Sequence, residues 1–179
     1  TYDNYGNIST ITTPDQSTYA FTYDISGNLL KAISPQLSAT SYEYDIMGNL
    51  KKVIDPSGKS SEFTYDSMGR RASLKDSNGN ITRYEYNYKG QITKVIDSLG
   101  GITTYEYGGT GCPSCGGGVD KLTAITDAEG NRTTYEYDLL GRLIKETDSE
   151  GKIITYSYDA SGNLISKAAP DGITVGYAY

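Results

Sequence analysis

Aromatic and polar residues alternate in short segments spread evenly along the chain. In Tyr135-Glu136-Tyr137 two rings flank a polar residue, and a period of two places both rings on one face of a β-strand. The residue between the rings then points to the opposite, wetter face. Aromatic and β-branched residues favour strands. The pattern predicts strands near residues 18–23, 39–44, 81–86, 102–107, 133–138 and 154–159.

One tyrosine of each segment keeps a spacing of 21 residues. The series consists of Tyr2, Tyr23, Tyr44, Tyr65, Tyr86, Tyr107, Tyr137, Tyr158 and Tyr179. One step is irregular, because 30 residues separate Tyr107 from Tyr137 and nine residues are therefore inserted there. This spacing predicts a single array of about eight repeats over residues 1–179, with a Gly/Cys insertion in the turn near 108–120.

A turn signal follows the regularly spaced tyrosines. An aspartate that can bond backbone amides two residues on is followed by a glycine that can take the positive φ of a type I turn with a bulge. The aspartate–glycine pairs are Asp24 and Gly27, Asp45 and Gly48, Asp66 and Gly69, Asp138 and Gly141, and Asp159 and Gly162. A second strand is expected about six residues after each tyrosine, and a second turn closes the repeat. The sequence therefore predicts an all-β, antiparallel hairpin meander.

Composition and charge exclude some classes of function. The chain has 18 Tyr, 2 Phe and no Trp or His, with a net charge of −6. No cluster of Lys or Arg offers phosphate contacts, which argues against a nucleic-acid partner. No apolar run approaches the ~20 residues that would cross a membrane. The chain opens on Thr1 without an initiator Met, and we expect it to be a fragment of a longer polypeptide.

The repeat resembles the YD repeat of the RHS family, which includes bacterial RHS polymorphic toxins, the C components of Tc toxins, and the teneurins. The resemblance is strongest in TSYEYDIMGNLKKVIDPSGK, residues 40–59, and in TTYEYDLLGRLIKETDSEGK, residues 133–152. Departures are expected to soften individual turns without changing the register. Asn87 and Gly108 replace the aspartate, Arg71 replaces the leucine, and Gln16 and Leu37 replace the second-turn glycine.

The resemblance implies a spiralling sheet that forms part of a shell around a hollow chamber, or of an extracellular repeat fibre. It implies a structural scaffold without catalysis or cofactor, secreted or at the cell surface. The expected partners are further YD repeats, or identical copies joined through sheet edges, and an enclosed toxin polypeptide. The alternative is an adhesion module whose tyrosine-rich surface binds glycans or a protein. The other interpretation of the rings, that they form the core, is favoured.

The insertion holds the two cysteines, Cys112 and Cys115. A redox centre is disfavoured because glycines flank the pair and no βαβ pattern follows. A zinc site would need ligands from another chain or repeat. A local disulfide, or a pair of thiols, that stiffens an enlarged turn is the favoured interpretation. The strands on either side are expected to keep their register, with Leu122 in the place of the usual leucine.

Two other kinds of site are weighed and set aside. The segment from Asp76 to Asn80 faintly resembles a calcium loop but has no flanking helices and no distal bidentate glutamate. Turn formation accounts for its Asp and Gly without an ion. The turn aspartates recur as part of the repeat rather than as one singular pair, so no acid–base catalytic centre is predicted.

Overall fold

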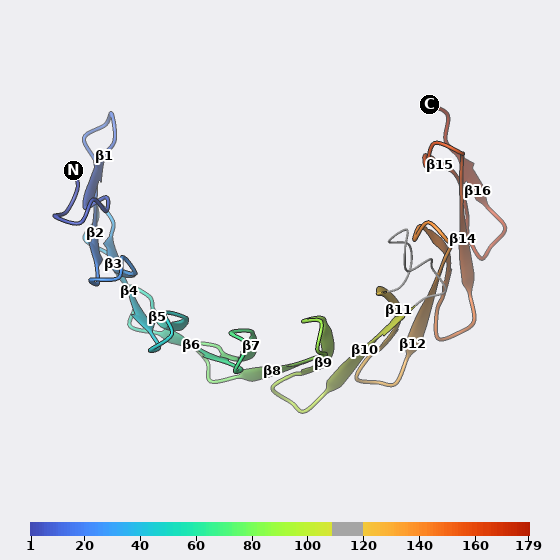
Figure 1. The fold of residues 1–179 in the computed structure, drawn as a ribbon, viewed down its shortest axis with the longest axis horizontal. Coiled ribbons are helices and arrows are strands. Elements are labelled where there is room, and N and C mark those ends of the chain that lie inside the picture. The colour runs from blue at the N-terminus through green and yellow to red at the C-terminus, as the bar shows by residue number, and fades with distance from the viewer. Residues whose placement is uncertain (109–119) are drawn as a thin grey trace. The chain divides into compact units, whose positions relative to one another are not determined.

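The computed structural model describes residues 1–108 and 120–179, and in these residues the chain forms β-strands and turns without a helix. No helix that could span a membrane is therefore found in the described part. The strands lie in chain order in an antiparallel sheet, β1 to β16 (Figure 1). The predicted fold class, an antiparallel hairpin meander, is confirmed.

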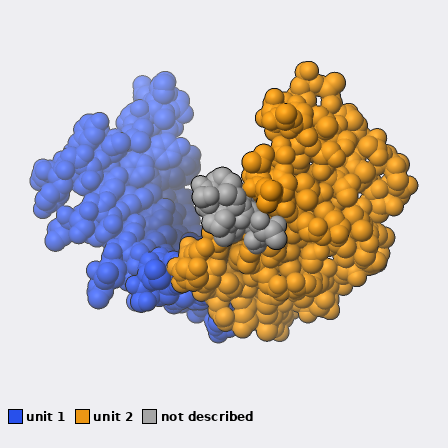
Figure 2. Space-filling model, turned by 45° about the vertical axis from the view of Figure 1, so that its right-hand side comes forward, with its two compact units in different colours: residues 1–84 blue, residues 85–179 orange. Residues whose placement is uncertain are grey.

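The chain divides into two compact units, residues 1–84 and residues 85–179 (Figure 2). The strands of the first unit are β1 (Thr10–Thr12), β2 (Thr18–Tyr23), β3 (Leu29–Ile33), β4 (Ala39–Tyr44), β5 (Leu50–Ile54), β6 (Ser60–Tyr65) and β7 (Arg71–Lys75). Strand β8 (Ile81–Tyr86) contains the division. The strands of the second unit are β9 (Ile92–Ile96), β10 (Ile102–Gly108), β11 (Lys121–Thr126), β12 (Arg132–Tyr137), β13 (Leu143–Thr147), β14 (Ile153–Tyr158), β15 (Leu164–Ala168) and β16 (Thr174–Gly176).

The predicted strands agree with the observed ones, except for small shifts at their ends. Strands β12 and β14 begin and end one residue earlier than predicted. The reason is local: the backbone N–H of Asp138 donates to the carbonyl of Arg142, and Asp159 makes the same bond to Asn163. Each aspartate is thus already the first residue of its turn.

The pairing register of the strands is kept across the nine-residue insertion. In the regular hairpins the spaced tyrosine pairs with the first residue of the next strand, as Tyr44 pairs with Leu50. Across the insertion Tyr107 still pairs with the leucine, Leu122, which is here the second residue of β11 because Gly108 also pairs with Lys121. The prediction that Leu122 takes the place of the usual leucine is confirmed. The predicted disulfide between Cys112 and Cys115 and the enlarged turn itself lie outside the described residues.

In the residues that the structure describes, each unit is a single layer, with no second sheet or helix packed on it. Among the described residues, Ala124 is the one hydrophobic side chain that is fully buried. The spaced tyrosines from Tyr23 to Tyr158 are half-buried in this single layer. Side-chain contact between adjacent strands therefore replaces a conventional core.

Candidate functional site

Most of the first turns that the structure describes are closed around one carboxylate. In the turn after β4, Oδ1 of Asp45 accepts hydrogen bonds from the backbone N–H groups of Met47 and Asn49, both at 2.9 Å. Its Oδ2 accepts a third from Nδ2 of Asn49 at 3.0 Å. Gly48 has φ +83° and donates its N–H to the Asp45 carbonyl. The aspartates predicted from the sequence thus serve the turn itself.

The same geometry is built with other residues where the sequence departs from the pattern. In the turn that starts at Asn87, its Oδ1 accepts from the backbone N–H of Lys89 and of Gln91. Its Nδ2 donates to Oε1 of Gln91 at 2.8 Å, which reverses the donor and acceptor of the Asp–Asn pair. The predicted softening of this turn is therefore not visible in its hydrogen bonds, which are all made.

Arginine takes the place of the asparagine in two first turns. Arg70 donates from Nε to Oδ2 of Asp66 at 2.7 Å, and Arg142 donates from Nε to Oδ2 of Asp138 at 2.6 Å. The guanidinium of Arg142 also lies over the ring of Tyr158, 4.8 Å from its centroid. An arginine here joins its own turn to a tyrosine of the following repeat, a contact worth roughly 0.5–1 kcal/mol at an exposed site.

Hydrogen bonds hold the turn aspartates in the ionised form. The pKa of Asp45 is lowered from its usual value near 3.8, chiefly by the side-chain hydrogen bond from Asn49 and then by that residue's backbone N–H. Hydrogen bonds to the carboxylate also lower the pKa of other aspartates in the first and second turns. These are Asp3, Asp15, Asp24, Asp55, Asp66, Asp76, Asp127 and Asp159.

Low pH is expected to destabilise the sheet, because protonation of the turn aspartates weakens the hydrogen bonds that they accept. Because the folded-state pKa lies below the unfolded value near 3.8, the turn aspartates stabilise the fold above that pH, and this contribution is lost as the pH falls through the folded pKa. Thermal unfolding followed by circular dichroism should show a midpoint that is constant near neutral pH and falls steeply below about pH 4. A midpoint that did not change down to pH 2 would contradict this role.

Two turns carry a side chain where the repeat has a glycine. Gln16 has φ +65° and Leu37 has φ +60°, both in the left-handed region, and the Leu37 side chain is exposed. The N–H of Leu37 still donates to the Ser34 carbonyl at 2.9 Å. The turn keeps its hydrogen bond, but the left-handed backbone conformation is unfavourable for an L-residue and destabilises the turn.

Leu37→Gly is therefore expected to stabilise the protein by about 0.5–1 kcal/mol, the left-handed penalty less the entropy that glycine adds to the unfolded chain. Urea denaturation measures the change. The matched control is Leu99→Gly, since Leu99 is equally exposed in a second turn but has no positive φ. If both substitutions shifted stability alike, backbone strain at Leu37 would be refuted.

The regularly spaced tyrosines connect neighbouring hairpins through their hydroxyl groups. The Tyr44 hydroxyl donates to the Leu29 carbonyl, at 3.0 Å, on the neighbouring strand β3. The ladder between β3 and β4 extends from Ile33 to Lys31, so the phenol reaches a carbonyl beyond it. Tyr65, Tyr107, Tyr137 and Tyr158 make the same bond to Leu50, Ile92, Leu122 and Leu143, each 15 residues earlier.

The two faces of the sheet differ in chemistry. On the face of the rings, Tyr42 pairs across the hairpin with Val53, and Phe63 pairs with Leu74. On the other face, acidic and basic residues form ion pairs between adjacent strands, except that Arg132 on β12 reaches across β11 to Glu106 on β10. The pairs are Lys52 with Glu62, Lys75 with Glu62, Lys94 with Glu85, Arg132 with Glu106, and Lys145 with Glu136. Exposed pairs of this kind contribute about 0.2–1 kcal/mol each.

The sequence prediction identified the turn aspartates, the glycines and the tyrosine spacing, and missed what the tyrosine hydroxyls bind and which charges pair. The constant offset of 15 residues between donor and acceptor is a signal in the spacing, but it has meaning only once strands are paired. Among the described residues, no group of three or more Asp, Glu, Cys or His side chains gathers as a metal site.

The single-layer sheet of repeated Tyr-Asp hairpins places this chain among the YD-repeat proteins. Comparison with known families leads to the same class. The Teneurin YD-shell profile matches residues 36–179, and the RHS Repeat profile matches residues 2–38. The chain belongs to the YD-shell family. No curated protein sequence matches it significantly.

Solved structures show the same fold. A mutant Tc holotoxin pore of Photorhabdus luminescens is 19% identical with a TM-score of 0.70, over 92% of this chain and 10% of that one. The TcdB2–TccC3 crystal structure is 17% identical with a TM-score of 0.73, over 98% of this chain and 12% of that one. The chain thus spans about a tenth of the length of these structures.

Proposed function

We propose that this chain is a segment of the wall of a YD-repeat shell, a structural part that encloses a polypeptide cargo and carries out no catalysis itself. The observation that carries the proposal is the single layer, in which Ala124 is the one fully buried hydrophobic side chain among the described residues. In such a sheet each strand is stabilised by the strands beside it and not by a compact core, so the sheet can be lengthened by adding repeats.

The two faces support the same role. A wall needs one surface toward an enclosed space and another toward the outside, and the aromatic face and the ion-paired face are chemically distinct. Membership of the YD-shell family and likeness to Tc toxin structures favour a toxin polypeptide as the cargo. Further YD repeats are then the direct partners, and the expected location is extracellular, either secreted or at the cell surface.

Protease protection in the full-length polypeptide that carries these repeats tests the proposal. The segment outside the repeats is expected to resist a broad-specificity protease while the sheet is intact. Opening the sheet with the double substitution Tyr44→Ala and Gly48→Val should render that segment digestible, whereas Tyr88→Ala, at an exposed turn tip, should leave it protected. Equal digestion in the intact and the opened protein would refute an enclosing role.

Glycan binding stays a prediction of the alternative function. It needs a row of freely exposed rings, whereas the regularly spaced tyrosines from Tyr23 to Tyr158 are half-buried. The hydroxyl groups of five of them donate to backbone carbonyls. Specific binding on a glycan array, lost in Tyr42→Ala, would favour the adhesion module over the wall.

A further inference from the structure

The second turn between β7 and β8 contains Asn78-Gly79, the one Asn-Gly pair of the chain. Glycine has no side chain that would keep its backbone nitrogen away from the side chain of the preceding residue. An asparagine in front of glycine is therefore especially open to an intramolecular reaction at its amide. In the other second turns that keep the glycine, the residue before it is Ser57, Leu99, Glu129, Glu150 or Asp171. The repeat thus does not require asparagine at this position.

The Asn78 side chain is accessible and takes no part in the turn. Asn78 and Gly79 are both exposed, and beyond its two neighbours in the chain no heavy atom lies within 4 Å of the position that a Cβ of Gly79 would occupy. Among the described residues, the side-chain amide of Asn78 has no hydrogen-bond partner. The neighbouring Asn80 differs, because its Nδ2 donates to Oδ2 of Asp76 at 2.8 Å. Asn78 can therefore react without first losing a side-chain contact.

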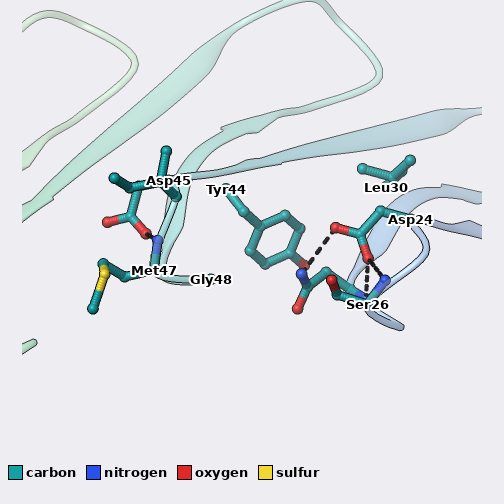
Figure 3. Close-up of a pocket in the computed structure, with 9 residues that line it drawn as sticks. Asp24, Ser26, Leu30, Tyr44, Asp45, Met47 and Gly48 are labelled. Atoms are coloured by element: carbon teal, nitrogen blue, oxygen red, sulfur yellow. Dashed lines mark hydrogen bonds between the residues drawn. The ribbon is translucent and has the colours of Figure 1, made fainter.

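The backbone of the turn, in contrast, restrains the nitrogen that would attack. The N–H of Gly79 donates to the Asp76 carbonyl at 3.0 Å, and the N–H of Asn78 donates to Oδ1 of Asp76 at 2.9 Å. Figure 3 shows the same construction in the first turn at Asp45, whose carboxylate accepts from the backbone N–H of Met47, the residue that corresponds to Asn78. The nitrogen of Gly79 must lose its proton and leave the Asp76 carbonyl before it can attack, so the reaction requires the turn to open.

We propose that Asn78 is a site of spontaneous deamidation, which proceeds when the turn between β7 and β8 opens. The deprotonated backbone nitrogen of Gly79 attacks Cγ of Asn78, a new C–N bond forms, and the bond from Cγ to Nδ2 breaks, so that ammonia leaves with a proton from water. Water then adds to either carbonyl of the cyclic imide and gives aspartate or isoaspartate. One water is consumed and one ammonia released, without oxidant or cofactor. The reaction needs no enclosed cargo, so this proposal can fail while protease protection holds.

Both products weaken the turn in which they form. The pKa of Asp76 is lowered, chiefly by the side-chain hydrogen bond from Asn80, so Asp76 is ionised near neutral pH. An aspartate at position 78 places a second negative charge beside it, and like charges repel. Isoaspartate adds a carbon atom to the backbone before Gly79, which displaces the N–H groups of Gly79 and Asn80 from their acceptors on Asp76. Transient opening of the turn thus leaves a permanent chemical change, and amide hydrogens of β7 and β8 should then exchange faster.

Peptide mapping by mass spectrometry tests the proposal on the 179-residue chain, incubated in mildly alkaline buffer with and without concentrated guanidinium chloride. In the folded chain, conversion of amide to acid should appear at Asn78 before any other asparagine, and more than about tenfold more slowly than in the denaturant. Asn78→Ser should abolish it and keep the fold by circular dichroism, since the chain itself has Ser57 at this position of the preceding second turn. Earlier reaction at another asparagine, or equal rates in the two solvents, would overturn the proposal.

Two aspartate variants test whether this one turn controls the reaction. Asp76→Ala removes the side-chain acceptor of the Asn78 N–H and should raise the rate in the folded chain about fivefold. Asp55→Ala is the matched control, because Asp55 accepts the same bonds from Ser57 and Lys59 in the preceding second turn. It should leave the rate at Asn78 unchanged, and in guanidinium chloride both variants should react like the unmodified chain. Equal acceleration by both variants, or acceleration by neither, would refute control by the turn at Asp76.

Discussion

Replacing Tyr44 by alanine is expected to lower the free energy of unfolding by about 2.5–3.5 kcal/mol, the largest effect we expect from one side chain in the first unit. Loss of the hydrogen bond from the hydroxyl to the Leu29 carbonyl accounts for roughly 1 kcal/mol. Loss of the ring accounts for the rest. It costs about half of the 3–5 kcal/mol measured for a fully buried aromatic side chain, because this ring is covered on one side only.

Tyr44→Phe separates the two contributions, since it keeps the ring and removes the hydroxyl, and should cost about 1 kcal/mol. Tyr88→Ala is the control for the substitution itself: Tyr88 is exposed at a turn tip and should change stability by no more than about 0.5 kcal/mol. Urea denaturation gives all three values. Equal losses in Tyr44→Phe and Tyr44→Ala would show that the ring contributes no packing.

Gly48→Val is expected to destabilise the protein by about 1–2 kcal/mol or somewhat more, through the backbone alone. Gly48 has φ +83°, and beyond its two neighbours in the chain no heavy atom lies within 4 Å of the position that a Cβ would occupy. Steric conflict with neighbours is therefore absent, and the cost is that of a β-branched L-residue in the left-handed region.

Gly48→Asn distinguishes this cause from the mere loss of a glycine, because asparagine enters the left-handed region more readily. It should cost clearly less than valine when both are compared by urea denaturation. If the two variants were equally destabilised, the positive φ of Gly48 would not be the reason for glycine at this position. Hydrogen exchange should place the loss in β4 and β5, the strands that the turn joins.

The rules of local structure explain why so much of the fold was predictable. Strand alternation at Tyr42 and Tyr44, and the turn from Asp45 to Gly48, depend on residues at most four positions apart. The insertion after Tyr107 left the pairing with Leu122 intact, because each hairpin carries its own register signals. The substitution of Asn87 and Gln91 for the usual Asp and Asn shows the same independence, since the exchange is completed within one turn.

These local rules did not predict the contacts between repeats. That the Tyr44 hydroxyl binds the Leu29 carbonyl follows only from where β3 and β4 stop pairing. Glu62 pairs with both Lys52 and Lys75, and the sequence alone offers several lysines as partners. That the exposed turn residues Ile25, Ile46 and Met68 lie along one edge likewise appears only when turns 21 residues apart are placed side by side.

The sequence by itself therefore determined the repeat, the strands, the turns and the register, because short-range hydrogen bonds and side-chain alternation decide them. The tertiary structure alone decided that the rings stay half-buried in a single layer, which charges pair, and which exposed turn residues lie along one edge. These properties depend on the distance between strands and on what covers each face. In a repeat array both are set by the stacking of neighbours, which no single repeat encodes.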